Sequence, residues 1–263
     1  MIFNNKYKCE DTISKGRFIT VYKVLNVINK EFYALKIFYD DEDSEEQYEK
    51  EIVALKNIKN KNIIELKDYF YDGINKGYCI VMELCDGNLS DILKKYKPKG
   101  LPLNIIKKIF IQLNDVLKAM IGIKLIHRNL KPENILIKYI DNNRTNFDIK
   151  LSSFNFSEFI TEEINFNDLV GTLNYMAPEI ETYHYNNKCD LWSLGVILYE
   201  LYTNKYIFYS NNAEETRINR KKGIIKNETD NEMINKLIRK LIQVNIKERI
   251  EWEEYFKDDF FKN

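Results

Sequence analysis

The spacing of apolar residues changes near residue 86, and this change limits the possible folds more than any other feature of the chain. Before it, apolar and polar residues alternate in short runs, as they do in strands that bury one face. After it, apolar residues recur every three or four positions, as they do in helices that bury one side. We therefore predict an α+β protein with a β-rich first third and a mostly helical remainder.

The first third predicts a small sheet and one helix. Residues 16–27 and 30–39 alternate around the turn "INK", which indicates a hairpin. The acidic stretch at 40–58 predicts a helix that Ser44 and Gln47 could open as a capping box. Two further strands are predicted within 62–84, joined by a turn that carries two glycines.

The remainder predicts three main helices. Apolar residues fall at helical spacing within residues 101–120, 189–204 and 231–245. The polar stretch "DNNRTN" at 141–146 lies between two short strand patterns, so we predict that it forms a hairpin tip.

Composition narrows the function classes. Lys+Arg and Asp+Glu both number 40, so no overall charge points to nucleic acid or to a membrane surface. No uninterrupted apolar run reaches membrane length. The four cysteines lack metal or disulfide spacing, which favours a reducing, cytoplasmic setting. The basic run at 217–226 is interpreted as a solvated helix face and turn.

Nine motifs then occur in one order along nearly the whole chain. They are "GRFITVYKV", "ALKIF", "EKEIVALKNI", "IVMELC", "IHRNLKPEN", "IKLSSFN", "GTLNYMAPE", "CDLWSLGVILYEL" and "IKERI". In this order they resemble a eukaryotic Ser/Thr protein kinase domain. The resemblance implies a bilobal α+β fold, with a five-stranded β lobe and one helix at 1–84 and a mostly helical lobe at 85–263.

The resemblance assigns nucleotide-binding roles in the first lobe. Lys36 matches the lysine that holds the α- and β-phosphates, and Glu51 matches the acid that pairs with it. The remaining residues implied around the adenine are Val21, Ala34 and Leu136 lining a slot, Met82 as gatekeeper, and a hinge from Glu83 to Cys85. Such apolar residues would also be buried in the core of an unrelated fold.

The catalytic loop departs from the family at one position. Lys131 resembles the residue that neutralises the transferred phosphate, and Asn134 resembles a metal ligand. Directly after Arg128, where the family has its catalytic aspartate, this chain has Asn129. An amide can hydrogen-bond a hydroxyl group but cannot accept its proton.

Two further positions depart from the pattern. The metal-binding aspartate of the D-F-G tripeptide aligns with Ser153, which has no negative charge to hold Mg²⁺. The phosphate-covering loop keeps only Gly16 of three glycines, with Ser14 and Ile19 in the other places. Because a general base contributes roughly 10²- to 10⁴-fold and a metal several kcal/mol, we expect very slow turnover at best.

These losses predict a pseudokinase that binds a protein partner, such as an active kinase or a signalling complex. The alternative is an atypical Ser/Thr kinase of low activity that uses Lys36, Lys131, Asn134 and an acid such as Glu133. We expect weak ATP binding that needs no metal, or none at all, and we expect Mg²⁺ not to bind. The identity of the partner and the oligomeric state stay open.

Two contacts are predicted in the segment from Ser153 to Glu179. Glu179 of "APE" should form a buried ion pair with Arg249 of "KERI". Asp168 stands where many family members carry a phosphothreonine, so its carboxylate could pair with Arg128 as a permanent substitute for phosphate. An ordinary acidic loop residue is an equal alternative for Asp168.

Overall fold

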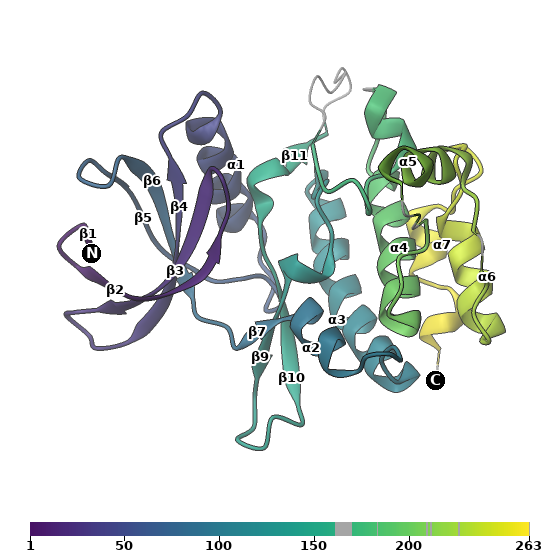
Figure 1. Ribbon diagram of the computed structural model, residues 1–263, viewed down its shortest axis with the longest axis horizontal. Helices are drawn as coiled ribbons and strands as arrows, with labels where there is room; N and C mark the ends of the chain where they lie inside the picture. The colour runs from purple at the N-terminus through teal and green to yellow at the C-terminus, as the bar shows by residue number, and fades with distance from the viewer. Residues whose placement is uncertain (161–169, 183, 209, 211, 226, 263) are drawn as a thin grey trace. The chain divides into compact units, whose positions relative to one another are not determined.

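The alternating stretches of the first third form one antiparallel sheet in the order β1-β2-β3-β4-β6-β5 (Figure 1). The computed structural model describes residues 1–160, 170–182, 184–208, 210, 212–225 and 227–262. The strands are β1 (Ile2–Phe3), β2 (Tyr7–Lys15), β3 (Ile19–Asn26), β4 (Phe32–Tyr39), β5 (Leu66–Asp72) and β6 (Gly77–Glu83). The hairpin predicted around "INK" is confirmed as β3 paired with β4. The two-residue β1 makes the sheet one strand larger than the five predicted.

The two faces of this sheet bury different side chains. Leu35 and Ile37 of β4 point to one face, where they pack with Val24, Cys79 and Val81 in an apolar cluster. Phe3 of β1 closes that cluster and is fully buried. Successive residues of a strand point to opposite faces, so Ala34 and Lys36 lie on the other side of β4.

The helix of this unit, α1 (Ser44–Asn57), lies against β4, β5 and β6. The predicted capping box is wrong. Asp43 precedes the helix, no described side chain caps it, and the Ser44 hydroxyl instead donates to the Tyr39 carbonyl. Gln47 uses its side-chain oxygen to accept a hydrogen bond from Asn155, so neither residue is available for the helix end.

The hairpin tip predicted at 141–146 is confirmed between β9 (Ile135–Tyr139) and β10 (Phe147–Leu151). The Ile64 amide donates to the carbonyl of Leu151 at the end of β10, and the Asn62 side chain donates to that of Ile149. Residues 136–157 therefore group with residues 1–86 in one compact unit, and residues 87–135 and 158–263 form the other. The first unit thus contains a later part of the chain that a division at residue 84 leaves out.

The second unit is mostly helical, as the apolar spacing predicts. Its longer helices are α2 (Leu89–Lys95), α3 (Leu103–Gly122), α4 (Lys188–Thr203), α5 (Ala213–Lys222) and α6 (Glu232–Leu241). Its short elements are β7 (Gly87–Asn88), β8 (Leu125–Ile126), η1 (Pro132–Asn134), β11 (Glu158–Phe159), η3 (Pro178–Thr182), α7 (Trp252–Tyr255) and η4 (Asp259–Phe261). Together the sheet unit and the helical unit confirm the α+β class. Within the described ranges, no helix is both long and apolar enough to cross a bilayer.

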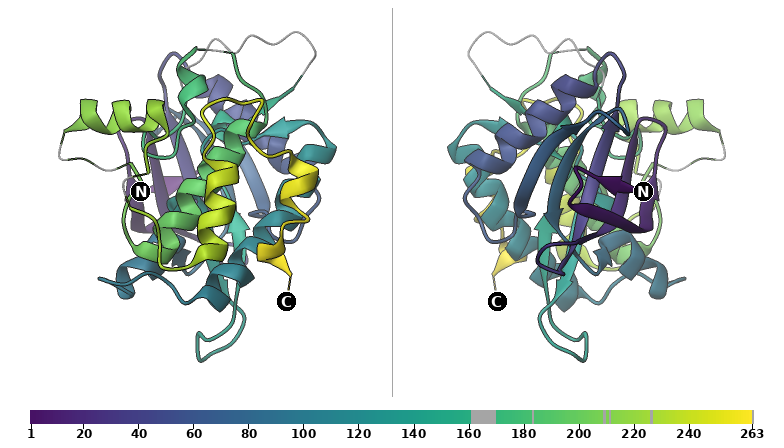
Figure 2. Two further views of the ribbon diagram at one scale, coloured as in Figure 1. Left: turned by 90° about the vertical axis from the view of Figure 1, so that its right-hand side faces the viewer. Right: turned by 90° about the vertical axis from the view of Figure 1, so that its left-hand side faces the viewer.

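The helix α4 forms the centre of the second unit. Nearly all of its residues are buried, which is typical of a helix with neighbours on every side. In Figure 2 α6 runs beside α4, and α6 contributes buried residues such as Leu237 and Leu241. Seven apolar residues of α3 are buried, and all seven belong to the predicted helical stripe. Ile105, which also belongs to that stripe, is only half-buried.

The basic run at 217–226 is only partly the solvated surface that we predicted. It begins in α5, and Gly223, which follows the last helical residue, adopts the left-handed conformation that favours glycine. Arg220 is 1% exposed, and its guanidinium donates to the Met176 carbonyl at 3.0 Å and to Glu181. Arg217 and Lys221 are more exposed and pair with the same Glu181 carboxylate. The prediction is wrong for Arg220, whose guanidinium is buried and contacts the Met176 carbonyl and the half-buried Glu181 carboxylate.

Candidate functional site

The strand register gathers four of the predicted nucleotide residues on one face of the sheet. Val21 of β3 lies opposite Lys36 of β4, and Ala34 lies opposite Met82 of β6. Opposed residues of antiparallel strands share a face, and so do residues two apart on one strand. Ala34 and Met82 are buried, while Val21 is half-buried, so this face offers a mostly apolar surface beside one ammonium group.

Lys36 and Glu51 form a buried ion pair between β4 and α1. Lys36 is 5% exposed and Glu51 is fully buried. Glu51 uses Oε2 for the pair, while its Oε1 has no hydrogen-bond partner among the described residues. The predicted pairing of these two residues is therefore present, and it holds the ammonium group at a defined place on the sheet face.

Glu83 has a structural role that the hinge assignment did not predict. Its carboxylate is buried and forms ion pairs with Lys138 of β9 and with Lys150 of β10, the latter at 2.8 Å. Burial acts to raise the pKa of Glu83, but the hydrogen bonds from the two lysines outweigh it, and the pKa is lowered. The side chain therefore connects the end of β6 to the β9–β10 hairpin.

The backbone at the hinge leaves one group that could contact a base. The amide of Glu83 donates to the Glu65 carbonyl, but the amide of Cys85 makes no hydrogen bond to any described residue. An unpaired N–H at this position fits the adenine contact that the resemblance assigns to the hinge. Leu136 on β9 is half-buried in the same unit.

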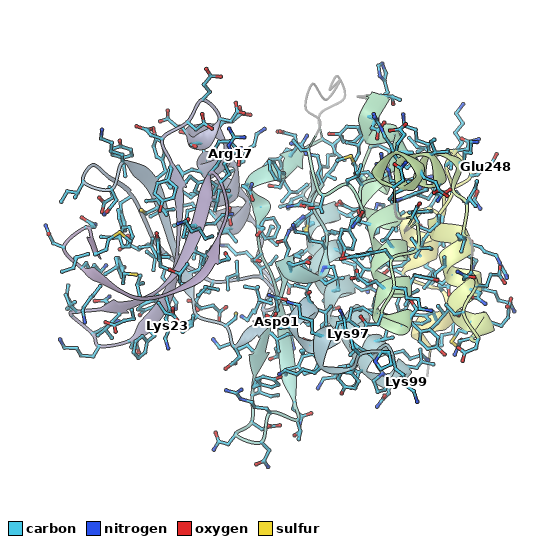
Figure 3. All side chains as sticks on the ribbon, in the orientation of Figure 1. Arg17, Lys23, Asp91, Lys97, Lys99 and Glu248 are labelled. Carbon is cyan, nitrogen blue, oxygen red and sulfur yellow. The ribbon has the colours of Figure 1, made fainter. Side chains whose placement is uncertain are left out.

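The loop that would cover phosphates is a tight turn between β2 and β3. The Gly16 amide donates to the Ile19 carbonyl at 2.8 Å, and a Cβ at Gly16 would lie 2.9 Å from that oxygen. The turn itself therefore requires glycine, whether or not phosphate binds. Ser14 is exposed on β2. The guanidinium carbon of Arg17, a residue labelled in Figure 3, lies 4.8 Å from the centre of the Phe18 ring.

Ser153 adopts a left-handed backbone conformation, with φ of 66°. This conformation is uncommon for residues other than glycine, asparagine and aspartate. The hydroxyl of Ser153 makes no hydrogen bond within the described part of the chain. Phe154, which follows it in η2 (Phe154–Phe156), is fully buried. Ser153 thus has a backbone conformation that aspartate adopts more readily than serine, but it has no carboxylate.

In the second unit, Asp190 of α4 anchors the catalytic loop. Its carboxylate accepts the backbone N–H groups of His127 at 2.8 Å and of Arg128 at 3.0 Å. Burial raises the pKa of Asp190 to about 6, although these hydrogen bonds and the Arg128 charge act to lower it. Arg128 has φ of 64°, so the anchored loop, like the turn at Ser153, holds a non-glycine residue in the left-handed region.

A chain of side-chain hydrogen bonds ends on Asn129. The Lys131 ammonium donates to the Thr172 hydroxyl at 3.0 Å, and that hydroxyl donates to the Asn129 side-chain oxygen at 3.1 Å. The Asn134 side chain donates to the Asn129 carbonyl at 2.7 Å. Asn129, Lys131 and Asn134, all predicted from the motif, therefore form one connected group in the second unit.

The guanidinium of Arg128 already has partners in its own unit. It donates to the Tyr185 hydroxyl at 3.0 Å and to the carboxylate of Glu158 in β11 at 3.5 Å. Asp168, the partner that we predicted for it, lies outside the described residues. The guanidinium of Arg128 thus contacts the carboxylate of Glu158, a partner that no motif indicated.

The predicted ion pair between Glu179 and Arg249 is confirmed. Both terminal nitrogens of Arg249 donate to the two oxygens of Glu179, one of them at 2.9 Å. Both residues are buried. The chain passes close to the catalytic loop shortly before this pair, because a Cβ at Gly171 would lie 2.8 Å from the Arg128 carbonyl oxygen.

Comparison with known proteins identifies the family. The sequence model described as "Protein kinase domain" matches residues 7–261. The chain belongs to the protein kinase domain family. The match covers both compact units, so the sheet unit and the helical unit are parts of one kinase domain.

Several curated kinases are similar to this kinase domain. Serine/threonine-protein kinase ULK1 of Homo sapiens is 30% identical over 276 residues, which cover 97% of this chain and 25% of that protein. Serine/threonine-protein kinase TIO of Arabidopsis thaliana is 33% identical over 212 residues, 79% of this chain and 15% of that protein. Myosin light chain kinase A of Dictyostelium discoideum is 32% identical over 218 residues, 80% of this chain and 70% of that protein. The kinase domain thus spans about a quarter or less of the first two relatives.

Sequence reasoning about this kinase domain missed several residues. Thr172 stands in the quoted motif "GTLNYMAPE", which was the available signal, but no role was assigned to it. Asn155, the third residue of the "SFN" tripeptide, was given no role, although it is 4% exposed and hydrogen-bonded on both sides. Tyr175 and Glu200 form a buried hydrogen bond of 2.6 Å that no local pattern indicates.

Proposed function

We propose that this kinase domain is a pseudokinase that acts by binding a protein partner in a cytosol-like compartment. The observation that carries the proposal is the orientation of Asn129. Lys131 can only donate hydrogen bonds, so the Thr172 hydroxyl accepts from it and uses its own hydrogen on the Asn129 oxygen. The side-chain nitrogen of Asn129 then points away from the Thr172 hydroxyl, and it makes no hydrogen bond to a described residue.

This orientation is unsuited to catalysis. A catalytic aspartate would keep one oxygen for the Thr172 hydroxyl and present the other to the substrate. Asn129 instead presents an N–H group, which can donate to a hydroxyl oxygen but cannot take its proton. The substitution therefore removes the base and places a donor in its position, a loss of roughly 10²- to 10⁴-fold in rate.

The residues at the two metal positions also fit Mg²⁺ poorly. Proteins usually bind Mg²⁺ through one or two carboxylates together with substrate phosphates. Here Ser153 supplies a neutral hydroxyl and Asn134 a neutral amide, so neither position supplies a carboxylate.

The intact structural parts support a role in binding. The Lys36–Glu51 pair, the Asp190 anchor and the Glu179–Arg249 pair are all formed. A kinase fold that lacks the aspartates at positions 129 and 153 can still present a defined surface to another protein, such as an active kinase. The partner is assigned by this analogy with kinase-shaped binding proteins.

Restoring aspartate at position 129 alone is expected to give no measurable phosphate transfer, because the carboxylate at 153 would still be missing. The measurement is intact-mass spectrometry after long incubation of wild-type and Asn129→Asp protein with ATP and Mg²⁺ or Mn²⁺, with Lys36→Ala as the control. Saturable phosphorylation that Lys36→Ala abolishes would contradict the proposal. That result would favour a low-activity kinase using Lys131, Asn134 and an acid such as Glu133.

ATP is expected to bind weakly and without help from metal. The Lys36 ammonium can contact phosphate oxygens directly, and the neutral Ser153 of the same unit repels a polyanion less than a carboxylate would. Calorimetry in EDTA and then in excess Mg²⁺ should give dissociation constants that differ by less than about tenfold, or 1.4 kcal/mol. Lys36→Ala should weaken both. Tight binding seen only with Mg²⁺ would overturn our interpretation of Ser153.

A further inference from the structure

An asparagine occupies a buried position where the resemblance places a glycine. Asn155 is the third residue of the "SFN" tripeptide and lies in η2, with 4% of its surface exposed. A glycine there would have no side chain to place beside Lys36 and α1. The amide of Asn155 is therefore an addition to the kinase fold, besides the losses at 129 and 153.

Asn155 hydrogen-bonds on both sides within the first unit. Its side-chain oxygen accepts from the Lys36 ammonium at 3.2 Å. Its side-chain nitrogen donates to the Gln47 oxygen at 3.1 Å. The ammonium can only donate, so it determines which end of the amide faces it and which end faces Gln47.

These contacts close a ring of four side chains. Lys36 also pairs with Glu51, and Gln47 and Glu51 are four residues apart on α1, hence on the same side of the helix. We define the Asn155 clasp as this ring of Gln47, Asn155, Lys36 and Glu51. It joins three segments that are distant in sequence: β4, α1 and the turn at 154–156.

We propose that the Asn155 clasp holds α1 against the turn at 154–156 without any ligand. Lys36 receives an amide oxygen from the chain itself, so its place beside Glu51 does not depend on nucleotide phosphate. Asn155 is thus a positioning residue that keeps α1 in one place and shares Lys36 with any anion that binds. The inference goes beyond the proposed function, because it would hold for an active or an inactive kinase.

Packing alone is the competing explanation, and variants of matched size separate the two. Asn155→Leu keeps nearly the same volume but removes both hydrogen bonds. Asn155→Asp keeps an acceptor for Lys36, and the Gln47 amide can turn to donate to it. Gln47→Leu breaks only the bond to α1, at a half-exposed position that tolerates substitution.

The test is hydrogen exchange with mass spectrometry on the nucleotide-free protein, reading peptides from α1 and, as a reference, from α3. In Asn155→Leu we expect exchange in α1 to become about tenfold faster, because buried polar groups lose their partners. Asn155→Asp should stay close to wild type. Adding Gln47→Leu to Asn155→Leu should change little further, because both act on one chain of bonds.

Other outcomes would overturn the proposal. Unchanged α1 exchange in Asn155→Leu would show that the hydrogen bonds do not hold the helix. Fully additive effects of the two leucine variants would show that Gln47 and Asn155 act separately. If Asn155→Leu unfolds the whole chain, the Gln47→Leu variant is the deciding test. Exchange in α1 equal to that of wild type would refute the clasp. Faster exchange in α1 with unchanged exchange in α3 would support it.

Discussion

Glu179→Ala is expected to lower the free energy of unfolding by about 3–5 kcal/mol, the cost of removing one partner of a buried ion pair. Arg249 is 1% exposed and would keep its charge without a carboxylate. Its remaining bonds, to the carbonyls of Gln243 and Lys188, do not neutralise that charge. Denaturation with urea at neutral pH measures the loss, which is a large part of the about 5–15 kcal/mol of an ordinary domain.

A matched control comes from an exposed pair. Glu228 pairs with Arg239 at 2.7 Å, and both side chains are about half exposed. Glu228→Ala should therefore change the unfolding free energy by no more than about 1 kcal/mol. A Glu179→Ala variant as stable as this control would show that the buried pair contributes little. Replacing Glu179 and Arg249 together by leucine should recover part of the loss.

Glu200→Gln is expected to stabilise the protein by about 3 kcal/mol at pH 8 and by less than about 1 kcal/mol at pH 5. Burial, with a smaller contribution from Glu133, raises the pKa of Glu200 to about 7 from its ordinary 4.5. The folded state then keeps a proton that the unfolded state releases, so stability falls as the pH rises from 4.5 to 7. Each unit by which the folded-state pKa exceeds the unfolded-state pKa costs about 1.4 kcal/mol of stability once both states are deprotonated. Glutamine stays neutral and can still accept from the Tyr175 hydroxyl.

Denaturation of both proteins at pH 5 and pH 8 checks this sign. Tyr175→Phe provides the opposite change, because the Tyr175 hydroxyl is the donor that acts to lower the pKa of Glu200. The stability of this variant should fall more steeply with pH than that of wild type. A Glu200→Gln variant destabilised equally at both pH values would show that Glu200 titrates normally.

The sequence by itself determined where most elements form and which family the chain resembles. Alternation predicted the β3–β4 hairpin, and helical spacing predicted α3, α4 and α6. These patterns can be recognised locally, because buried residues recur every two positions in a strand and about every 3.6 positions in a helix. Motif order also located Lys36, Glu51 and the Glu179–Arg249 pair, since family members keep these positions in order.

Only the tertiary structure decided which polar groups are partners. Asn155 and Lys36 are 119 residues apart, and Glu83 meets lysines that follow it by 55 and 67 residues. The same holds for Ser44, which sequence reasoning assigned to a helix cap, and for Arg220, which it placed at the surface. A side chain that can donate or accept has many possible partners in a sequence. The fold selects one of them by bringing it within hydrogen-bond distance and excluding water from both.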